Sequence, residues 1–247
     1  GAWLMSIFEK AFEKAAKGTA EEQADQPFGS ADDLVNLPES LDDDGAGSTR
    51  TEDPDYGMWN EDQSQAAGSG KLVKLDLSRL REAGLVDPGS SKTNRTTEEF
   101  RRIKRPLLMH VRGQGATVVN NANMIMVTSA LPGEGKTFTS INLAMSIAME
   151  MDKTVLLIDA DVAKPDVTAR LGVEAERGLI DILLDDGLTL PEVLLRTDIP
   201  KLTLLPSGRR HVHSTELLAS ERMRQLTLEL SNRYSDRIVI FDSPPLL

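Results

Sequence analysis

Three short runs of apolar residues constrain the fold of this chain more than any other feature. They are Met-Ile-Met-Val, Val-Leu-Leu-Ile and Ile-Val-Ile-Phe, and they fall within expected strands at 124–128, 154–158 and 237–241. Strands without polar alternation are typical of parallel sheets that are buried on both faces. These runs alternate with helical stretches, which predicts βαβ units and an α/β fold with flanking helices. We expect helices at 136–150, near 166–171, near 178–185 and at 215–232, and a further strand at 202–205.

The loop after the first of these strands has the spacing of a P-loop. A small residue is followed by four residues and then by Gly-Lys-Thr, in the stretch Ala130-Leu131-Pro132-Gly133-Glu134-Gly135-Lys136-Thr137. Its glycines let backbone N–H groups turn inward to form an anion nest. The helix that follows points its positive N-terminal end at the same place. Lys136 adds a full charge and the Thr137 hydroxyl can ligate Mg²⁺, so the loop predicts binding of a nucleoside triphosphate with Mg²⁺.

Carboxylates follow two of the other strands at the edge where parallel sheets bind ligands. Asp159 and Asp161 come two residues apart after the strand at 154–158, so an extended chain leaves them on one side. Beside a P-loop such a pair predicts a metal-binding or general-base role, the alternative being a loop or helix cap. Asp242 ends the strand at 237–241, where a carboxylate holds a Mg²⁺-bound water in P-loop proteins. Its alternative role is to cap the strand end.

A basic helix is expected before the P-loop domain, from Glu98 towards His110 and helical as far as Pro106. Glu99, Arg102 and Arg105 are spaced three apart and therefore share one side of it. From the residues alone this is a solvated face with ion pairs within the helix. No aromatic residues are interleaved, and the chain from residue 71 onward is nearly neutral, so nucleic acid is not an expected partner.

The excess of negative charge, −11 for the whole chain, lies in its first part. Residues 1–70 hold 16 of the 39 acidic residues but only 4 of the 28 basic residues. We expect four regions. They are an amphipathic helix at 1–17, a disordered acidic linker at 18–70, a docking segment with the basic helix at 71–122, and the P-loop domain at 123–247. The first helix is expected to dock on its own domain or a partner, with a membrane surface as the alternative.

Composition excludes several other classes of protein. The chain has no cysteine, so it contains neither disulfides nor cysteine-based metal sites. No run of 18 apolar residues predicts a membrane-spanning helix. No cleavable leader is evident, so we expect the chain not to be secreted.

Together these motifs resemble those of the bacterial tyrosine kinases (BY-kinases) that control polysaccharide polymerisation and export. The resemblance covers roughly residues 98–247. Ser-Ala-Leu-Pro-Gly-Glu-Gly-Lys-Thr, Leu-Leu-Ile-Asp-Ala-Asp and Ile-Phe-Asp-Ser-Pro-Pro are similar to the Walker A, Walker A′ and Walker B motifs of that family. Met-Ser-Ile-Phe-Glu-Lys-Ala at residues 5–11 and Glu-Phe-Arg-Arg-Ile-Lys-Arg-Pro-Leu-Leu at residues 99–108 look like the exosortase-associated subgroup, whose members are cytoplasmic kinases.

The resemblance implies an ATP-dependent protein-tyrosine autokinase with Mg²⁺ as cofactor. Lys136 and the loop 130–137 would hold the phosphates, and Asp159 would be the base for a tyrosine hydroxyl. Thr137, Asp161 and Asp242 would position the metal. The Glu-x-x-Arg-x-x-Arg element at Glu99, Arg102 and Arg105 implies assembly into a ring. The implied partners are a membrane polysaccharide co-polymerase that acts as activator and the tyrosines of the chain itself, with recruitment to the inner face of the inner membrane as an alternative to a purely cytoplasmic location.

Two departures from the family pattern affect this interpretation. The tyrosine-rich C-terminal tail is absent and the sheet is expected to be incomplete at its C-terminus, which predicts a truncated kinase. Tyr56 and Tyr234 are the two tyrosines of the chain. Tyr56 is the acceptor by default, and Tyr234 is expected to pack on its helix. Many members carry Arg after the Asp-x-Asp pair, whereas this chain has Lys164, which lacks the bidentate geometry of Arg.

Two other functions stay open at this stage. One is a P-loop ATPase switch of the septum-positioning and plasmid-partition type. Those ATPases carry a second lysine where this chain has Leu131, which argues against them. The other is a non-catalytic ATP-binding module that assembles with a polysaccharide co-polymerase.

Overall fold

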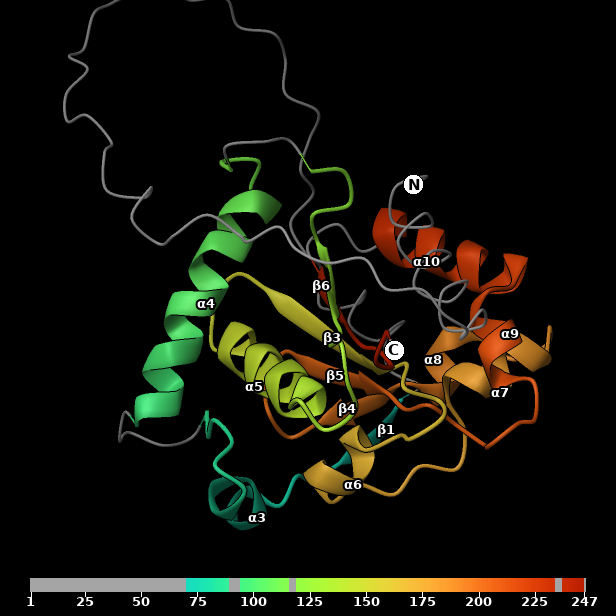
Figure 1. Ribbon diagram of the computed structural model, residues 1–247, viewed down its shortest axis with the longest axis horizontal. Coiled ribbons are helices and arrows are strands. Elements are labelled where there is room, and N and C mark those ends of the chain that lie inside the picture. The colour runs from blue at the N-terminus through green and yellow to red at the C-terminus, as the bar shows by residue number, and fades with distance from the viewer. Residues whose placement is uncertain (1–69, 89–93, 116–118, 234–236, 247) are drawn as a thin grey trace, which may run out of the picture.

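A computed structural model of the chain describes residues 70–88, 94–115, 119–233 and 237–246. The expected helix at 1–17, almost all of the acidic linker at 18–70, and both tyrosines lie outside the described residues. The described part forms a central sheet with helices on both of its faces, as Figure 1 shows. Within it, no helix combines the length and apolar character needed to cross a membrane.

The described sheet has six strands in the order β1-β4-β5-β3-β6-β2. Their bounds are β1 (Lys71–Val73), β2 (Met124–Val127), β3 (Thr154–Asp159), β4 (Leu195–Thr197), β5 (Leu202–Leu205) and β6 (Arg237–Asp242). Every neighbouring pair is parallel except β4 and β5, which are antiparallel. The predicted α/β fold is therefore confirmed, but the sheet is mixed rather than wholly parallel.

Strand β4 was not expected from the sequence, because it is short and carries an exposed arginine in its centre. Leu195 and Thr197 are buried on one side of it, while Arg196 points to solvent. Its backbone pairs with β5 on one side and with β1 on the other. The sheet, and not any local apolar run, makes this segment a strand.

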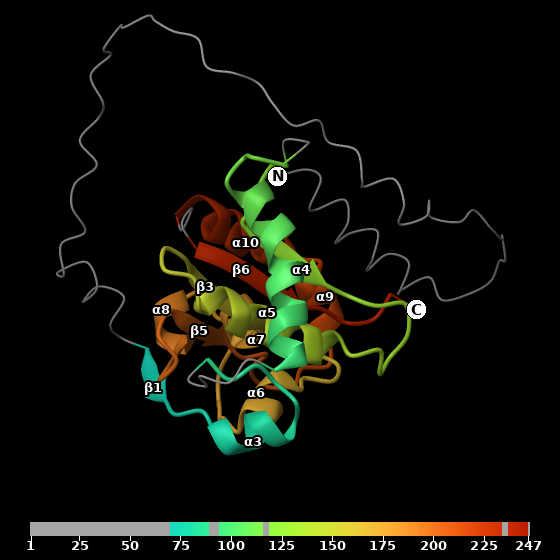
Figure 2. The same ribbon diagram turned by 90° about the vertical axis from the view of Figure 1, so that its left-hand side faces the viewer.

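The helices form two layers, which Figures 1 and 2 show from two directions. One layer packs its apolar residues into the same core cluster and consists of α3 (Leu77–Glu82), α4 (Arg95–Val111), α5 (Lys136–Ala148) and α6 (Val167–Leu171). The other lies on the opposite face of the sheet and consists of α7 (Leu179–Leu184), α8 (Leu190–Val193), α9 (Ser214–Leu218) and α10 (Glu221–Arg233).

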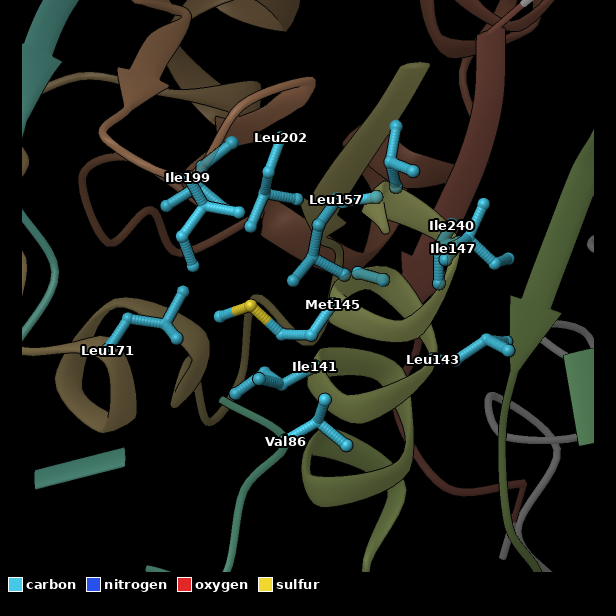
Figure 3. Packing of buried hydrophobic residues seen from close by; sticks show 14 of the residues in the cluster. Val86, Ile141, Leu143, Met145, Ile147, Leu157, Leu171, Ile199, Leu202 and Ile240 are labelled. Atoms are coloured by element: carbon cyan, nitrogen blue, oxygen red, sulfur yellow. The ribbon is translucent and has the colours of Figure 1, made fainter. Parts of the chain in front are cut away.

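Helix α5 is the most deeply buried helix described, because the sheet covers one side of it and α4 and the 75–86 segment cover others. Ile141, Met145 and Ile147 are fully buried and belong to the same core cluster as Leu157 and Ile240 of the sheet, which Figure 3 shows from close by. Full burial of such side chains contributes roughly 1.5–3 kcal/mol each. The helix begins at Lys136, directly after the P-loop, so its packing fixes where that loop lies.

Helix α4 extends past Pro106 to Val111, whereas we expected it to end at the proline. A proline inside a helix removes one backbone hydrogen bond and costs about 3 kcal/mol. Leu108 is buried, and Leu107 and Val111 pack against the core, so tertiary contacts hold the turns that follow the proline. Lys104 also connects α4 to α5, because its Nζ donates a hydrogen bond to the Ser146 carbonyl oxygen at 2.6 Å.

The expected helix at 215–232 is divided into α9 and α10. Ser220 stands between them, and its hydroxyl accepts a hydrogen bond from the backbone N–H of Met223. The same hydroxyl donates to the carbonyl of Leu217. One serine hydroxyl therefore gives a hydrogen-bond partner to a carbonyl at the end of α9 and to an N–H at the start of α10. This favours two separate helices over one continuous helix.

Asn142 joins the 75–87 segment to helix α5, and its replacement should loosen that segment. Its Oδ1 accepts from the backbone N–H of Val86 at 2.6 Å, in a fully buried position. Asn142→Ala leaves that N–H without a partner, so we expect a loss of about 1–3 kcal/mol of unfolding free energy. Hydrogen exchange should accelerate in residues 75–87.

Asn94→Ala provides the matched control for this change. Asn94 is exposed and caps α4 by accepting from the N–H of Thr97, so its loss should cost about 1 kcal/mol without altering exchange in 75–87. Equal exchange in the two variants would contradict the role given to Asn142.

Candidate active site

The loop between β2 and α5 is exposed and is shaped by two glycines in the left-handed region. Gly133 has a φ of 85° and Gly135 a φ of 88°, and no atom lies within 4 Å of a Cβ built on either. These conformations suit glycine and allow successive N–H groups to face one concave side. The Ser129 hydroxyl donates to the Leu131 carbonyl, and the Leu131 N–H donates to a Glu134 carboxylate oxygen at 3.0 Å. Residues 130–134 are all exposed.

Lys136 and Thr137 begin helix α5 and point towards carboxylates from two strands. The Lys136 side chain is buried, and its Nζ lies 3.9 Å from Asp161 Oδ2. The Thr137 hydroxyl donates to Asp242 Oδ2 at 2.7 Å. The structure therefore brings the P-loop lysine and threonine together with two of the three aspartates identified in the sequence.

Asp159 and Asp242 lie directly opposite each other at the carboxyl ends of β3 and β6. Both are fully buried. Asp159 Oδ2 accepts from the backbone N–H of Val167, but its Oδ1 has no hydrogen-bond partner among the described residues. A buried carboxylate oxygen without a partner is costly to the fold, and such oxygens concentrate at sites of function.

Burial and charge repulsion make Asp159 a weak acid. Burial is the largest cause and Asp242 the next, and together they raise the pKa of Asp159 to about 7. The pKa of Asp242 is also raised, mainly by burial, although hydrogen bonds from Thr137 and Ser140 oppose the rise. A carboxyl group whose pKa lies near neutral pH can accept and release a proton there.

These residues fit a phosphate group and a magnesium ion. The nest of N–H groups and the Lys136 ammonium suit the negative oxygens of a phosphate chain. The described residues contain no cluster of three or more His, Cys, Asp or Glu side chains that could hold a metal. Mg²⁺ instead keeps several waters and takes one or two protein oxygens beside phosphates. Thr137 and Asp242, whose oxygens already touch, match that kind of site.

Ser140 belongs to this site but was not identified in the sequence. It is fully buried, one turn after Lys136, and its hydroxyl lies 3.0 Å from both Asp242 Oδ1 and the Lys136 carbonyl. It thereby gives the second oxygen of Asp242 a partner. A serine three residues after the P-loop threonine was the available signal, since that spacing places both on one side of a helix.

Glu99, Arg102 and Arg105 lie apart from this site, on α4. All three are exposed. Glu99 pairs with Arg95 at 2.7 Å, one turn earlier on the helix. The expected exposed face is therefore present on α4, the helix that Lys104 connects to α5.

Asp159→Asn should stabilise the nucleotide-free protein at pH 8. The folded chain holds the Asp159 proton more tightly than the unfolded chain does, so ionisation costs folding free energy between about pH 4 and pH 7. At pH 8 that cost is complete, and the asparagine removes it while keeping an acceptor for Val167. We expect a rise in Tm of at least about 2 °C by differential scanning calorimetry.

Asp166→Asn is the control for that change. Its carboxylate is partly exposed and pairs with Arg170, so neutralising it should leave Tm unchanged or lower. A lower Tm for Asp159→Asn than for the parent would show that the buried charge is not a source of strain.

A family model described as an AAA domain matches residues 122–247. Tyrosine-protein kinase YwqD of Bacillus subtilis strain 168 is 36% identical over 178 residues, which cover 72% of this chain and 67% of that protein. Tyrosine-protein kinase wzc of Salmonella typhimurium is 33% identical over 183 residues, and there the match spans 74% of this chain but only 24% of the relative.

Solved structures show the same fold. The crystal structure of the chimerical protein CapA2B2 aligns with a TM-score of 0.52 at 26% identity, covering 75% of each chain. The BceF tyrosine kinase domain aligns with a TM-score of 0.54 at 24% identity, covering 76% of each chain. With its P-loop, its three aspartates and these matches, the chain belongs to the bacterial tyrosine kinase family.

Proposed function

We propose that this chain is an ATP-dependent protein-tyrosine kinase that phosphorylates itself and regulates exopolysaccharide biosynthesis and export. One observation carries the proposal. Asp159, with an unpartnered buried oxygen and a pKa of about 7, lies beside Asp242 at the sheet edge that the P-loop also borders. The family membership of the chain supports the same activity.

In this proposal the P-loop and Lys136 bind the β- and γ-phosphates of ATP. The backbone N–H groups of the 130–137 loop surround the phosphates, and the buried Lys136 ammonium neutralises charge that gathers on them during transfer. Thr137 and Asp242 would hold Mg²⁺, and Ser140 fixes the Asp242 carboxylate by a hydrogen bond. Bound Mg²⁺ would neutralise phosphate charge, and Asp161 would help to position it through water.

Asp159 is the proposed proton acceptor for the tyrosine hydroxyl. The phenol has a pKa near 10, so its proton leaves late, as the bond to phosphorus forms. Asp159 Oδ2 is held by the Val167 N–H, which leaves Oδ1, without a partner among the described residues, as the oxygen that would accept the proton. Most of the rate enhancement would come from positioning and charge neutralisation.

A switch ATPase is disfavoured by the P-loop itself. Such ATPases carry a lysine at the position of Leu131, and here that side chain is apolar and 53% exposed. Its backbone N–H is bonded to Glu134. This loop position therefore lacks the second cation of a switch ATPase.

The proposal extends to partners, location and subgroup. The chain is placed in the cytoplasm as a member of the exosortase-associated subgroup, with a membrane polysaccharide co-polymerase as its activator. The motifs at residues 5–11 and 99–108 support the subgroup. A binding assay with the cytoplasmic part of a co-polymerase encoded in the same genome would test the partnership.

Lys136→Met should abolish tyrosine phosphorylation, because it removes the buried cation that faces the phosphates. Asp159→Asn should lower the rate by at least about 100-fold, the usual contribution of a positioned base. The assay follows label from γ-labelled ATP with Mg²⁺ into phosphotyrosine, both in the chain and in a tyrosine peptide without charged side chains.

Lys74→Met is the matched control, since Lys74 is exposed at the far edge of the sheet and should leave the rate unchanged. Release of free phosphate without phosphotyrosine would instead identify a switch ATPase. ATP binding with neither product would identify a non-catalytic module.

We further propose that the exposed face of α4 mediates ring assembly through Glu99, Arg102 and Arg105. Arg102→Ala and Arg105→Ala should shift the sedimentation profile towards monomer, because each removes a charged contact at a subunit boundary. Arg101→Ala is the control, since Arg101 is already paired with Glu98 on its own helix at 2.6 Å. An unchanged profile for both test variants would contradict the ring.

A further inference from the structure

Helix α6 contacts the proposed base directly. Val167, its first residue, donates its backbone N–H to Asp159 Oδ2 at 3.1 Å. The helix has only five residues, and helices shorter than about 12 residues are marginal without tertiary contacts. The position of Val167, and with it the orientation of the Asp159 carboxylate, therefore depends on what packs against α6.

Residues 71–87 form a strap that packs against this helix. The strap consists of β1, α3 and the residues that lead from α3 to α5. In Figures 1 and 2 α3 lies beside α6, and the two helices are in contact. A Cβ built on Gly172, directly after α6, would lie 3.7 Å from the Cβ of Asp76, which caps the start of α3. The start of α3 thus lies against the end of α6.

The strap is bonded to the rest of the fold at both of its ends. Asp198, the residue after β4, accepts from the Leu75 N–H at 3.0 Å, and its own N–H donates to the Val73 carbonyl. At the other end, Asn142 of α5 accepts from the Val86 N–H. Because the sheet and α5 hold the two ends, α3 is kept in place over α6.

The core beneath the strap joins α3 to α6. Leu80 of α3 is fully buried and belongs to the same core cluster as Val167 and Leu171 of α6. Such clusters are close-packed, so truncation of one member leaves a cavity into which its neighbours relax. A shift of α6 into that space would carry the Val167 N–H away from Asp159.

We propose that the strap is a positioning element of the active site, in which Leu80 holds α6 where Val167 orients Asp159. This inference rests on the proposed kinase function. The bond from Val167 occupies Oδ2 and leaves Oδ1 for the proton of the acceptor, so its loss lets the carboxylate turn. ATP would still bind, because the P-loop and Lys136 do not depend on α6. Loss of the strap contact therefore lowers kcat and leaves the KM for ATP unchanged.

Leu80→Ala tests the proposal through steady-state kinetics with the uncharged tyrosine peptide, ATP and Mg²⁺. We expect kcat to fall at least about tenfold, as displacement of a reacting group by a fraction of an ångström does, with the KM for ATP unchanged. Leu80→Met conserves side-chain volume and should restore kcat.

Leu230→Ala is the matched control. Leu230 lies on α10 and is as fully buried as Leu80, but it belongs to the core cluster on the opposite face of the sheet. Both alanine variants should lower Tm, since each empties a buried leucine site. Leu230→Ala should nevertheless leave kcat unchanged, which separates a role in positioning from a role in stability alone.

Hydrogen exchange at the Val167 amide follows the position of α6 without any catalysis. The measurement uses NMR on the whole chain without nucleotide. Leu80→Ala should accelerate exchange at Val167, because that N–H loses its buried acceptor. Leu80→Met and Leu230→Ala should leave it as in the parent.

Asp76→Ala is a milder variant that keeps the core intact. Asp76 is exposed and accepts from the N–H groups of Ser78 and Arg79 at the start of α3. Its removal should loosen α3, accelerate exchange at Val167 and lower kcat, whereas Asp76→Asn keeps a capping oxygen and should restore both. Asn94→Ala removes the cap of α4 instead and should change neither.

The outcomes separate the strap from the kinase. Unchanged exchange at Val167 in both Leu80→Ala and Asp76→Ala would overturn the strap. Faster exchange with an unchanged kcat, or a lower kcat with a raised KM for ATP, would overturn its role in positioning Asp159. Faster exchange in variants of a parent that makes no phosphotyrosine would confirm that the strap holds α6 and would overturn the kinase function.

Discussion

The pairing of β3 with β6 places two carboxylates side by side in the interior, and the rest of the site is arranged around that contact. Asp159 and Asp242 are opposite each other in the register and both are fully buried. Two negative charges so placed repel each other and are poorly solvated. Helix α5 supplies the compensation, because Thr137 and Ser140 donate to Asp242 and Lys136 lies near Asp161. Asp159 keeps one oxygen without a partner.

This arrangement links stability to function. Helix α5 is buried against the sheet by Ile141 and Met145 and is clamped from outside by Lys104 of α4. Its first turn therefore cannot move away from the carboxylates without opening the core. Apolar packing of α5 against the sheet keeps the two carboxylates close together in spite of their repulsion. Unfavourable arrangements of this kind are characteristic of catalytic sites. The helix that carries the proposed ring contact, α4, is held by Lys104 against α5, the helix that follows the P-loop.

The sequence predicted most of the buried part of the fold. The strands at 154–158, 202–205 and 237–241 lie where they were expected, to within a residue, because uninterrupted apolar runs leave few alternatives. The P-loop was identified from its spacing between a strand and a helix, and the three aspartates from their places at the ends of apolar strands. Strand β4 and the end of α4 were not, because each depends on partners distant in the sequence. The exposed Arg196 hides the strand pattern of β4, and Pro106 is a residue that usually ends a helix. Local sequence preferences therefore predicted neither β4 nor the helical turns after Pro106.

By itself the sequence determined which residue types this loop offers to a phosphate chain, since the glycines, Lys136 and Thr137 are fixed by their spacing along one loop and one helix. Only the tertiary structure decided that Asp159 would be the carboxylate with a free oxygen, because that depends on the register between β3 and β6 and on Val167 occupying the other oxygen. It likewise decided that the chain enters β1 at the edge of the sheet where β5 and β3 end, which is the edge that carries Asp159. Strand direction follows from pairing between β1, β4 and β5, and no local pattern of residues encodes it.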